Sequence, residues 1–116
     1  MRNLLVQAAG VLGIAAALVH GYLGEAKVFA SPRIPAGRTR LLLRGVWHCS
    51  VIDWAVMGAL LILVPTLGSD RARIAIVSAS AVVFAAGAIG NAWASRGRHF
   101  GWVWLALVVG LAAAGM

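Results

Sequence analysis

Four apolar stretches, separated by short polar turns, dominate this 116-residue chain and restrict what it can fold into. They predict helices at about residues 4–25, 41–64, 74–94 and 100–115. A helix that crosses a bilayer needs roughly 17–25 mostly apolar residues, so the first three stretches qualify and the fourth is at the short limit. None shows the alternation of apolar and polar residues that a membrane β-barrel requires. We therefore predict an all-α fold, an integral membrane bundle of four transmembrane helices that forms a single domain, 1–116.

The composition agrees with a membrane protein and excludes several other classes. Hydrophobic residues make up 62% of the chain and charged residues only 11%, whereas a soluble domain is nearer half apolar and a quarter charged. The net charge of +7 comes from basic residues that flank the apolar stretches, where they set topology and meet anionic lipid headgroups. We therefore expect the lipid bilayer as a partner and no nucleic acid. Cys49 is the only cysteine, which rules out an internal disulfide.

The basic residues also predict an orientation. Most lie in or beside the first and third loops, and few lie on the opposite side. The first group is Lys27, Arg33, Arg38, Arg40, Arg44, Arg96 and Arg98, and the second is Arg2, Arg71 and Arg73. Positively charged loops stay in the cytoplasm, so we expect loops one and three there and both termini in the periplasm. The Ala-, Gly-, Val- and Arg-rich composition is typical of a GC-rich bacterial genome, and hence of a bacterial inner membrane.

Ionisable residues gather where the first two apolar stretches approach their connecting loop. His20 and His48 stand at about equal distances from the loop, and so do Glu25 and Arg44. In an antiparallel hairpin each pair therefore lies at one depth, about one helical turn apart. His20 and Glu25 would diverge by about 140° on a regular helix, but the glycines between them permit local unwinding that would bring both inward. Charged groups at membrane depth are costly, so this cluster is a candidate site.

Several roles fit the cluster, and the spacing does not choose among them. Glu25 and Arg44 could form a structural ion pair that holds the hairpin together. His20, Glu25, His48 and His99 could bind a divalent metal. Alternatively, His20 and His48 could ligate a haem axially, with Arg44 and Trp47 as further cofactor-binding residues. The same histidines with Arg and Trp could hold a quinone head group.

Asp53 is a separate candidate, about 7 Å deeper than His48 along the second helix. We expect it near mid-bilayer, on the face shared with Cys49, Ser50 and Met57 and opposite residues 15–17 of the first helix. A single carboxylate at this depth is what proton-coupled transporters use, so Asp53 is a candidate proton or ion site. It could equally be protonated and hydrogen-bonded to a neighbouring helix.

Small residues at four-residue spacing predict where the helices touch, because small side chains let helix backbones approach in lipid. These are Ala9, Gly13, Ala17 and Gly21 in the first helix, Ala86 and Gly90 in the third, and Ala106, Gly110 and Ala114 in the fourth. Apart from Asn91 and His99, the third and fourth helices offer no strong polar group to a site.

The first hairpin carries two short motifs. His20-x-x-Leu23-Gly24-Glu25 ends the first helix, and Arg44-x-x-Trp47-His48 followed by Trp54 opens the second. This half of the chain resembles a group of small bacterial four-helix membrane proteins. The resemblance implies that His20, Glu25, Arg44 and His48 act as one unit. Gly21 replaces a serine that is frequent in that pattern, and Cys49 and Asp53 are not part of it.

With almost no polypeptide outside the membrane, the chain has no room for a soluble catalytic domain. We therefore expect a small non-catalytic membrane protein, an accessory subunit or a cofactor- or metal-binding component of a larger membrane complex, or a homo-oligomer. Two alternatives remain open. One is a minimal b-type haem or quinone redox protein that uses His20 and His48. The other is a proton-coupled small transporter centred on Asp53.

Overall fold

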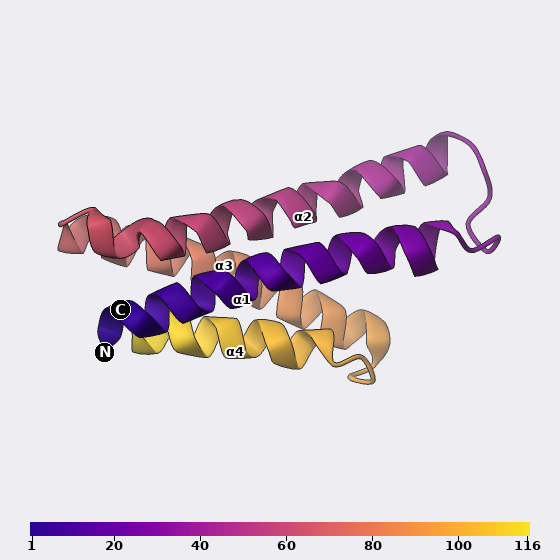
Figure 1. Ribbon diagram of the computed structural model, residues 1–116. Coiled ribbons are helices and arrows are strands. Elements are labelled where there is room, and N and C mark those ends of the chain that lie inside the picture. The colour runs from indigo at the N-terminus through magenta and orange to yellow at the C-terminus, as the bar shows by residue number, and fades with distance from the viewer.

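The structure, a computed structural model, describes residues 1–116 as four antiparallel helices without a strand (Figure 1). They are α1 (Arg2–Leu23), α2 (Arg38–Leu63), α3 (Asp70–Ser95) and α4 (Gly101–Ala114). A π-helix, η1 (Gly24–Phe29), continues α1, and a 3-10 turn, η2 (Val64–Thr66), ends α2. The predicted all-helical fold is thus confirmed.

Three of the helical segments are long and apolar enough to cross a membrane, namely Arg2–Phe29, Arg38–Thr66 and Asp70–Ser95. The fourth helix is equally apolar but has only 14 residues, which falls short of the usual length of a span. The length and composition of these three helices are therefore consistent with a membrane protein. A transmembrane role for α4 stays a prediction.

The two ends of the bundle differ in what they contain. The α1–α2 loop and the α3–α4 turn lie at one end, which we call the loop end, and both chain termini lie at the other, the terminal end (Figure 1). The α1–α2 hairpin extends farther at the loop end than the α3–α4 hairpin does (Figure 1). All the polar residues of the predicted hairpin cluster therefore lie at the loop end.

Glycines bring α1 and α2 together in the terminal half. A Cβ atom on Gly10 would lie 2.5 Å from the backbone oxygen of Gly58, and one on Gly58 would lie 2.7 Å from that of Gly10. Neither position has room for a side chain. Ala9, Gly13 and Ala17 of the predicted α1 stripe are also buried, with Gly13 against the ring of Phe84, so this part of the prediction is confirmed.

The small residues of α3 and α4 behave differently from the prediction. Ala106, Gly110 and Ala114 are exposed, and so are Ala86 and Gly90. Those stripes do not mark contacts within this bundle, and the prediction is wrong for these two helices. The physical reason is the rotation of the two helices, which turns another face of each, with both large and small residues, toward the interior. The buried residues are Val77, Ser80, Phe84 and Ala88 in α3, and Leu105, Val108 and Ala112 in α4.

Local capping sets where the helices begin. The Ser69 hydroxyl accepts a hydrogen bond from the Ala72 N–H, 3.3 Å, and so starts α3 at Asp70, four residues earlier than predicted. In the first loop the Arg40 guanidinium donates to the carbonyl oxygens of Ser31 and Ile34, at 2.8 and 2.7 Å. These bonds fasten the proline-containing loop to the start of α2.

Candidate ligand-binding site

The end of α1 widens into the π-helix η1, in which each N–H bonds to the carbonyl five residues back instead of four. The wider turn lets His20 and Glu25, five residues apart, both contact α2. The local departure from α-helical geometry that we predicted near the glycines is confirmed. Gly24 is required here because a Cβ atom would lie 2.2 Å from the indole nitrogen of Trp47.

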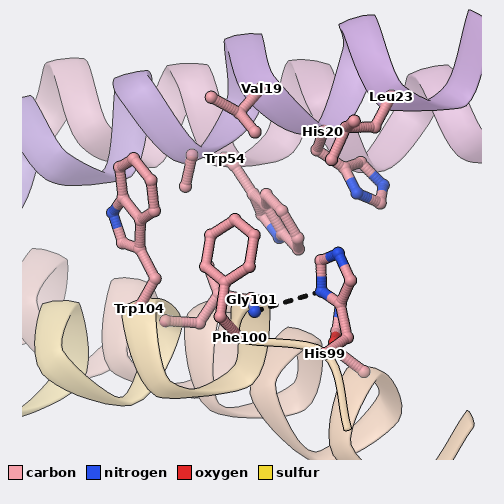
Figure 2. A pocket seen from close by; sticks show the side chains of 11 residues that line it. Val19, His20, Leu23, Trp54, His99, Phe100, Gly101 and Trp104 are labelled. Atoms are coloured by element: carbon pink, nitrogen blue, oxygen red, sulfur yellow. Dashed lines mark hydrogen bonds between the residues drawn. The ribbon is translucent and has the colours of Figure 1, made fainter. Parts of the chain in front are cut away.

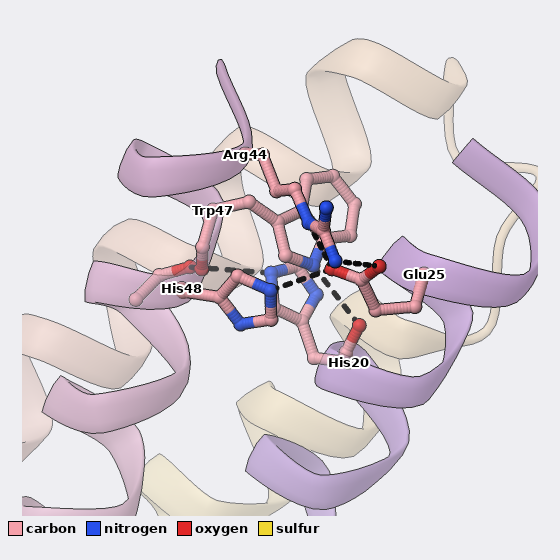
Figure 3. Close-up of polar contacts among 6 residues, drawn as sticks. His20, Glu25, Arg44, Trp47 and His48 are labelled. Atoms are coloured by element: carbon pink, nitrogen blue, oxygen red, sulfur yellow. Dashed lines mark hydrogen bonds and ion pairs between the residues drawn. The ribbon is translucent and has the colours of Figure 1, made fainter. Parts of the chain in front are cut away.

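Glu25 joins the two helices through an ion pair (Figure 3). Its carboxylate accepts two hydrogen bonds from Arg44, Nε to Oε1 and Nη2 to Oε2, each 2.7 Å. The Nε2 atom of His48 also donates to Oε1, at 2.7 Å. The side chains of these three residues are between 39% and 52% exposed, so the cluster lies on the surface of the bundle and not in its core. The predicted structural pair is therefore present, with His48 as a third member.

His20 lies between two tryptophans of α2. Its ring stacks on Trp47, with 4.1 Å between ring centroids and 6° between planes, and lies 4.6 Å from Trp54. The indole N–H of Trp47 donates to the His20 carbonyl oxygen, 3.0 Å. The ring of Phe29 is perpendicular to that of Trp47, with 5.8 Å between the ring centroids. These contacts fix the imidazole between α1 and α2.

The hydrogen bonds around His20 fix which nitrogen carries the proton. The Ser50 hydroxyl donates to the Trp47 carbonyl oxygen at 2.6 Å. Because a hydroxyl has only one proton, Ser50 has none left to donate to His20. The His20 Nε2 atom, 3.2 Å from the same hydroxyl oxygen, must then be the donor. A neutral imidazole protonated at Nε2 keeps a lone pair at Nδ1. His20 therefore offers an acceptor nitrogen that has no hydrogen-bond partner in the protein.

A cleft of about 690 Å³ opens beside His20 at the loop end. Its wall includes the aromatic rings of Phe29, Trp47 and Trp54, and polar side chains from three helices. At its rim, Leu43 and Val46 of α2 and Gly90 and Ala94 of α3 are exposed. Part of the opening of the cleft therefore lies between α2 and α3, while Val28, Ile34 and the exposed His99 line it at the loop end.

Asn91 and His99 complete the polar lining. The Asn91 side-chain oxygen is buried and has no hydrogen-bond partner. The Nδ1 atom of His99 accepts a hydrogen bond from the Gly101 N–H, 3.1 Å (Figure 2). A neutral His99 therefore carries its proton at Nε2, which makes that atom a donor. Figure 2 shows the rings of His99 and His20 facing one another across the space between α1 and the α3–α4 turn.

A second, smaller cavity of about 30 Å³ adjoins the cleft and extends toward α4 (Figure 2). It is large enough for a single water molecule. The two spaces share five lining residues, namely His20, Leu23, Trp54, Asn91 and His99. His20 and Asn91, the two residues with an unpaired acceptor, therefore each line both spaces.

The structure does not assemble the predicted metal site. No three His, Cys, Asp or Glu side chains come together in a way that could hold a metal ion. Glu25 is occupied by Arg44 and His48, while His20 is bonded to Ser50 and His99 to Gly101. The prediction of one site from His20, Glu25, His48 and His99 is corrected, because Glu25 and His48 belong to the surface ion pair whereas His20 and His99 line the cleft.

The predicted pair of His20 and His48 is also divided between two environments. No hydrogen bond joins the two rings, since His20 bonds to Ser50 and His48 to Glu25. Of the residues proposed to bind a cofactor, His20 and Trp47 line the cleft, whereas Arg44 and His48 belong to the surface ion pair. His99, expected only as a metal ligand, joins His20 at the cleft.

Asp53 points away from α1, contrary to the prediction. It is exposed, as are Cys49 and Val56 on the same stripe, and it has no hydrogen bond or ion pair within the chain. The rotation of α2 is set by the burial of Trp54, Gly58 and Leu61, which turns Asp53 outward. Ser50 and Met57, expected to share its face, turn toward the interior and contact His20 and Ser80.

Sequence reasoning missed Phe29, Ser50 and Trp54 as site residues and gave Asn91 no role. Asn91 had a usable signal, because it is the only side-chain amide in the third apolar stretch. Ser50 and Trp54 are ordinary residues of an apolar helix whose part in the cleft follows only from the rotation of α2, and the place of Phe29 follows from the π-helix η1. The chain matches no family model, and no curated protein or solved structure is significantly similar to it.

Proposed function

We propose that this protein is a small non-catalytic integral membrane protein that binds a flat, lipid-soluble organic molecule in the cleft at its loop end. The observation that carries the proposal is the unpaired Asn91 oxygen, buried in the wall of a cleft lined by Phe29, Trp47 and Trp54. A buried polar atom without a partner costs free energy unless something binds it. Ligand sites typically combine apolar walls with a few convergent polar groups in this way.

The dimensions and the mouth of the cleft support a ligand that arrives from the bilayer. A volume of about 690 Å³ lies within the usual range of roughly 300–1,000 Å³ for small-molecule sites. In a membrane-spanning bundle, a mouth between two apolar helices faces lipid. The exposed rim residues Leu43, Val46 and Gly90 are apolar, so a lipid-soluble molecule could enter sideways without crossing a polar surface.

Mass spectrometry of the mildly solubilised protein tests this proposal by detecting any retained small molecule. Gly90 lines the cleft and has open space around its α-carbon, so Gly90→Trp would fill the cleft without disturbing the fold. Gly110→Trp, at an equally open position on α4, is the matched control. We expect wild type and Gly110→Trp to retain the molecule and Gly90→Trp to lose it. Equal retention by both variants would refute the cleft as the site.

An absorption spectrum of the same sample separates the cofactor alternatives. A Soret band that is lost in His20→Ala would identify the retained molecule as a haem and support the redox alternative. A sample without visible absorption that still retains a molecule would support the colourless ligand that we propose.

The outward face of α2 favours a second role, as a subunit of a membrane assembly. Asp53 is exposed in the middle of a candidate span and has no partner in its own chain. A carboxylate that faces hydrocarbon is costly, so a neighbouring helix that donates a hydrogen bond to it would stabilise the assembly. The alternative, a transporter centred on Asp53, would require this residue to line a pathway, and none of the three cavities includes it.

Cross-linking through the single cysteine tests the assembly. Cys49 lies one turn from Asp53 on the same exposed face. If this face is covered, a bismaleimide added to intact membranes will yield a product of twice the chain mass for a homo-oligomer, or another defined mass for a different subunit. The product should weaken in Asp53→Leu. An exclusively monomeric chain in wild type would contradict the proposal.

We further propose a bacterial cytoplasmic membrane as the location, with the loop end in the cytoplasm. Seven of the ten Lys and Arg residues lie on that side. A reporter that is active only in the periplasm, fused to the C-terminus, should be active. An inactive periplasmic reporter together with an active cytoplasmic one would reverse this orientation.

A further inference from the structure

We infer that the cleft recognises an aromatic hydroxyl group, and hence that it binds a hydroquinone in preference to the corresponding quinone. This inference rests on the proposed function and adds the chemical class and redox state of the ligand. It follows from which atoms in the cleft can donate a hydrogen bond and which can only accept one.

Two acceptors at the cleft are unpaired. The first is His20 Nδ1, whose lone pair is free because Nε2 must donate to the Ser50 hydroxyl oxygen. The second is the side-chain oxygen of Asn91, which is buried without a partner. Both residues line the cleft and the small cavity next to it. A ligand that satisfies either acceptor must bring a hydrogen-bond donor.

One donor faces them. His99 accepts at Nδ1 from the Gly101 N–H, so its Nε2 carries the proton. Figure 2 shows this ring turned toward His20. A hydroxyl group both donates and accepts, so one hydroxyl placed between the rings could donate to His20 and accept from His99. A carbonyl oxygen could accept from His99 but would leave His20 and Asn91 unsatisfied.

The walls of the cleft favour a ligand in which that hydroxyl is attached to an aromatic ring. Trp47 and Trp54 both contact the His20 ring, and the ring of Phe29 is perpendicular to that of Trp47. Flat rings stack favourably on such surfaces. A hydroquinone combines a flat apolar ring with hydroxyl groups, whereas its oxidised form keeps the ring and loses every donor.

The test compares three probes of nearly the same shape. Tetramethylhydroquinone carries two hydroxyl donors, tetramethylbenzoquinone carries only acceptors, and the dimethyl ether of the hydroquinone also lacks donors. Binding to the full chain in lipid nanodiscs is measured calorimetrically without oxygen, and partitioning into empty nanodiscs is subtracted. Because an unsatisfied buried acceptor is costly, we expect the hydroquinone to bind at least about tenfold more tightly than either other probe.

Variants assign the preference to particular atoms. Asn91→Leu should weaken hydroquinone binding about tenfold and leave quinone binding nearly unchanged. His20→Phe keeps an aromatic ring beside Trp47 but removes Nδ1, and should also reduce the preference for the hydroquinone. Gln7→Leu is the matched control, because Gln7 is a half-buried amide at the terminal end, far from the cleft lining. Helical content and elution volume show whether each variant is folded.

The outcomes separate this inference from the proposed function. Quinone binding that equals or exceeds hydroquinone binding would overturn the inference, while the cleft would still be a binding site. Failure of all three probes would overturn it as well. In that case, a molecule retained by wild type and lost in Gly90→Trp would keep the proposed function, and the absence of any retained molecule would remove both.

Discussion

The terminal and loop ends of the bundle use the same apolar helices for different purposes. In the terminal half, Gly10 and Gly58 let the backbones of α1 and α2 touch, and no cavity is found there. At the loop end, the mouth between α2 and α3 leads into a cleft of about 690 Å³ lined by rings and polar groups. Small residues allow close helix packing in the terminal half, whereas large aromatic residues keep the helices apart at the loop end.

The comparison shows that the two halves of the bundle are held together by different interactions. Close backbone contact supplies the dispersion attraction that holds helices together in lipid. The loop end depends instead on hydrogen bonds and an ion pair, made by Trp47, Arg44 and Glu25 between α1 and α2. The effects of substitutions on stability should therefore differ between the two regions, both in size and in physical cause.

The largest effect is expected where the backbones touch. Gly58→Leu would place a side chain within 2.7 Å of the Gly10 carbonyl oxygen, which cannot move without separating α1 from α2. We expect a loss of about 3 kcal/mol or more in the free energy of unfolding, measured by denaturant titration in mixed micelles. Gly45→Leu, on the open face of the same helix, is the control and should change little. Equal effects would mean that the contact between the backbones is unimportant.

A smaller loss is expected from breaking the ion pair at the loop end. Glu25→Leu leaves Arg44 and His48 without their shared acceptor. The melting temperature should fall, but by less than in Gly58→Leu because the cluster is half exposed to solvent or headgroups. A double-mutant cycle with Arg44→Met measures the coupling. Additive effects would show that the two side chains do not stabilise one another.

The next effect in size concerns the indole N–H of Trp47, which joins α2 to α1. Trp47→Phe keeps an aromatic ring but removes the hydrogen bond to the His20 carbonyl oxygen. The expected cost is about 1 kcal/mol in the free energy of unfolding. Trp93→Phe is the matched control, since Trp93 is 83% exposed and makes no such bond. A similar loss of stability in both variants would mean that the smaller ring, and not the missing hydrogen bond, causes the effect.

The smallest effect is expected to be stabilising. Gly110 lies on the exposed face of α4 with no atom near the position of a Cβ. Glycine inside a helix costs roughly 0.5–1 kcal/mol relative to alanine, so Gly110→Ala should raise the free energy of unfolding by about that amount. If the substitution instead destabilises the protein in membranes, this face of α4 packs against another chain.

Much of the fold was predictable, because helix length and polar turns can be read directly along the chain. The four helices, the antiparallel hairpins and the pairing of Glu25 with Arg44 follow from apolar length and from distance to the loop. The glycines near residue 24 also indicated that α1 would depart from regular geometry. These features depend on the local sequence and on the rule that residues equally far from a hairpin loop lie beside one another.

The amino-acid sequence thus determined the helices and the position of each polar residue along the bundle, whereas only the tertiary structure decided the direction in which each residue points. In a soluble helix, the apolar side identifies the core, but in lipid both sides are apolar and the pattern loses this information. The rotation of α2 about its own axis therefore could not be predicted from the sequence. In the structure, this rotation turns Asp53 outward and Ser50 and Trp54 inward. For the same reason the cleft, with His20, Asn91 and His99 around it, became visible only when the helices were packed.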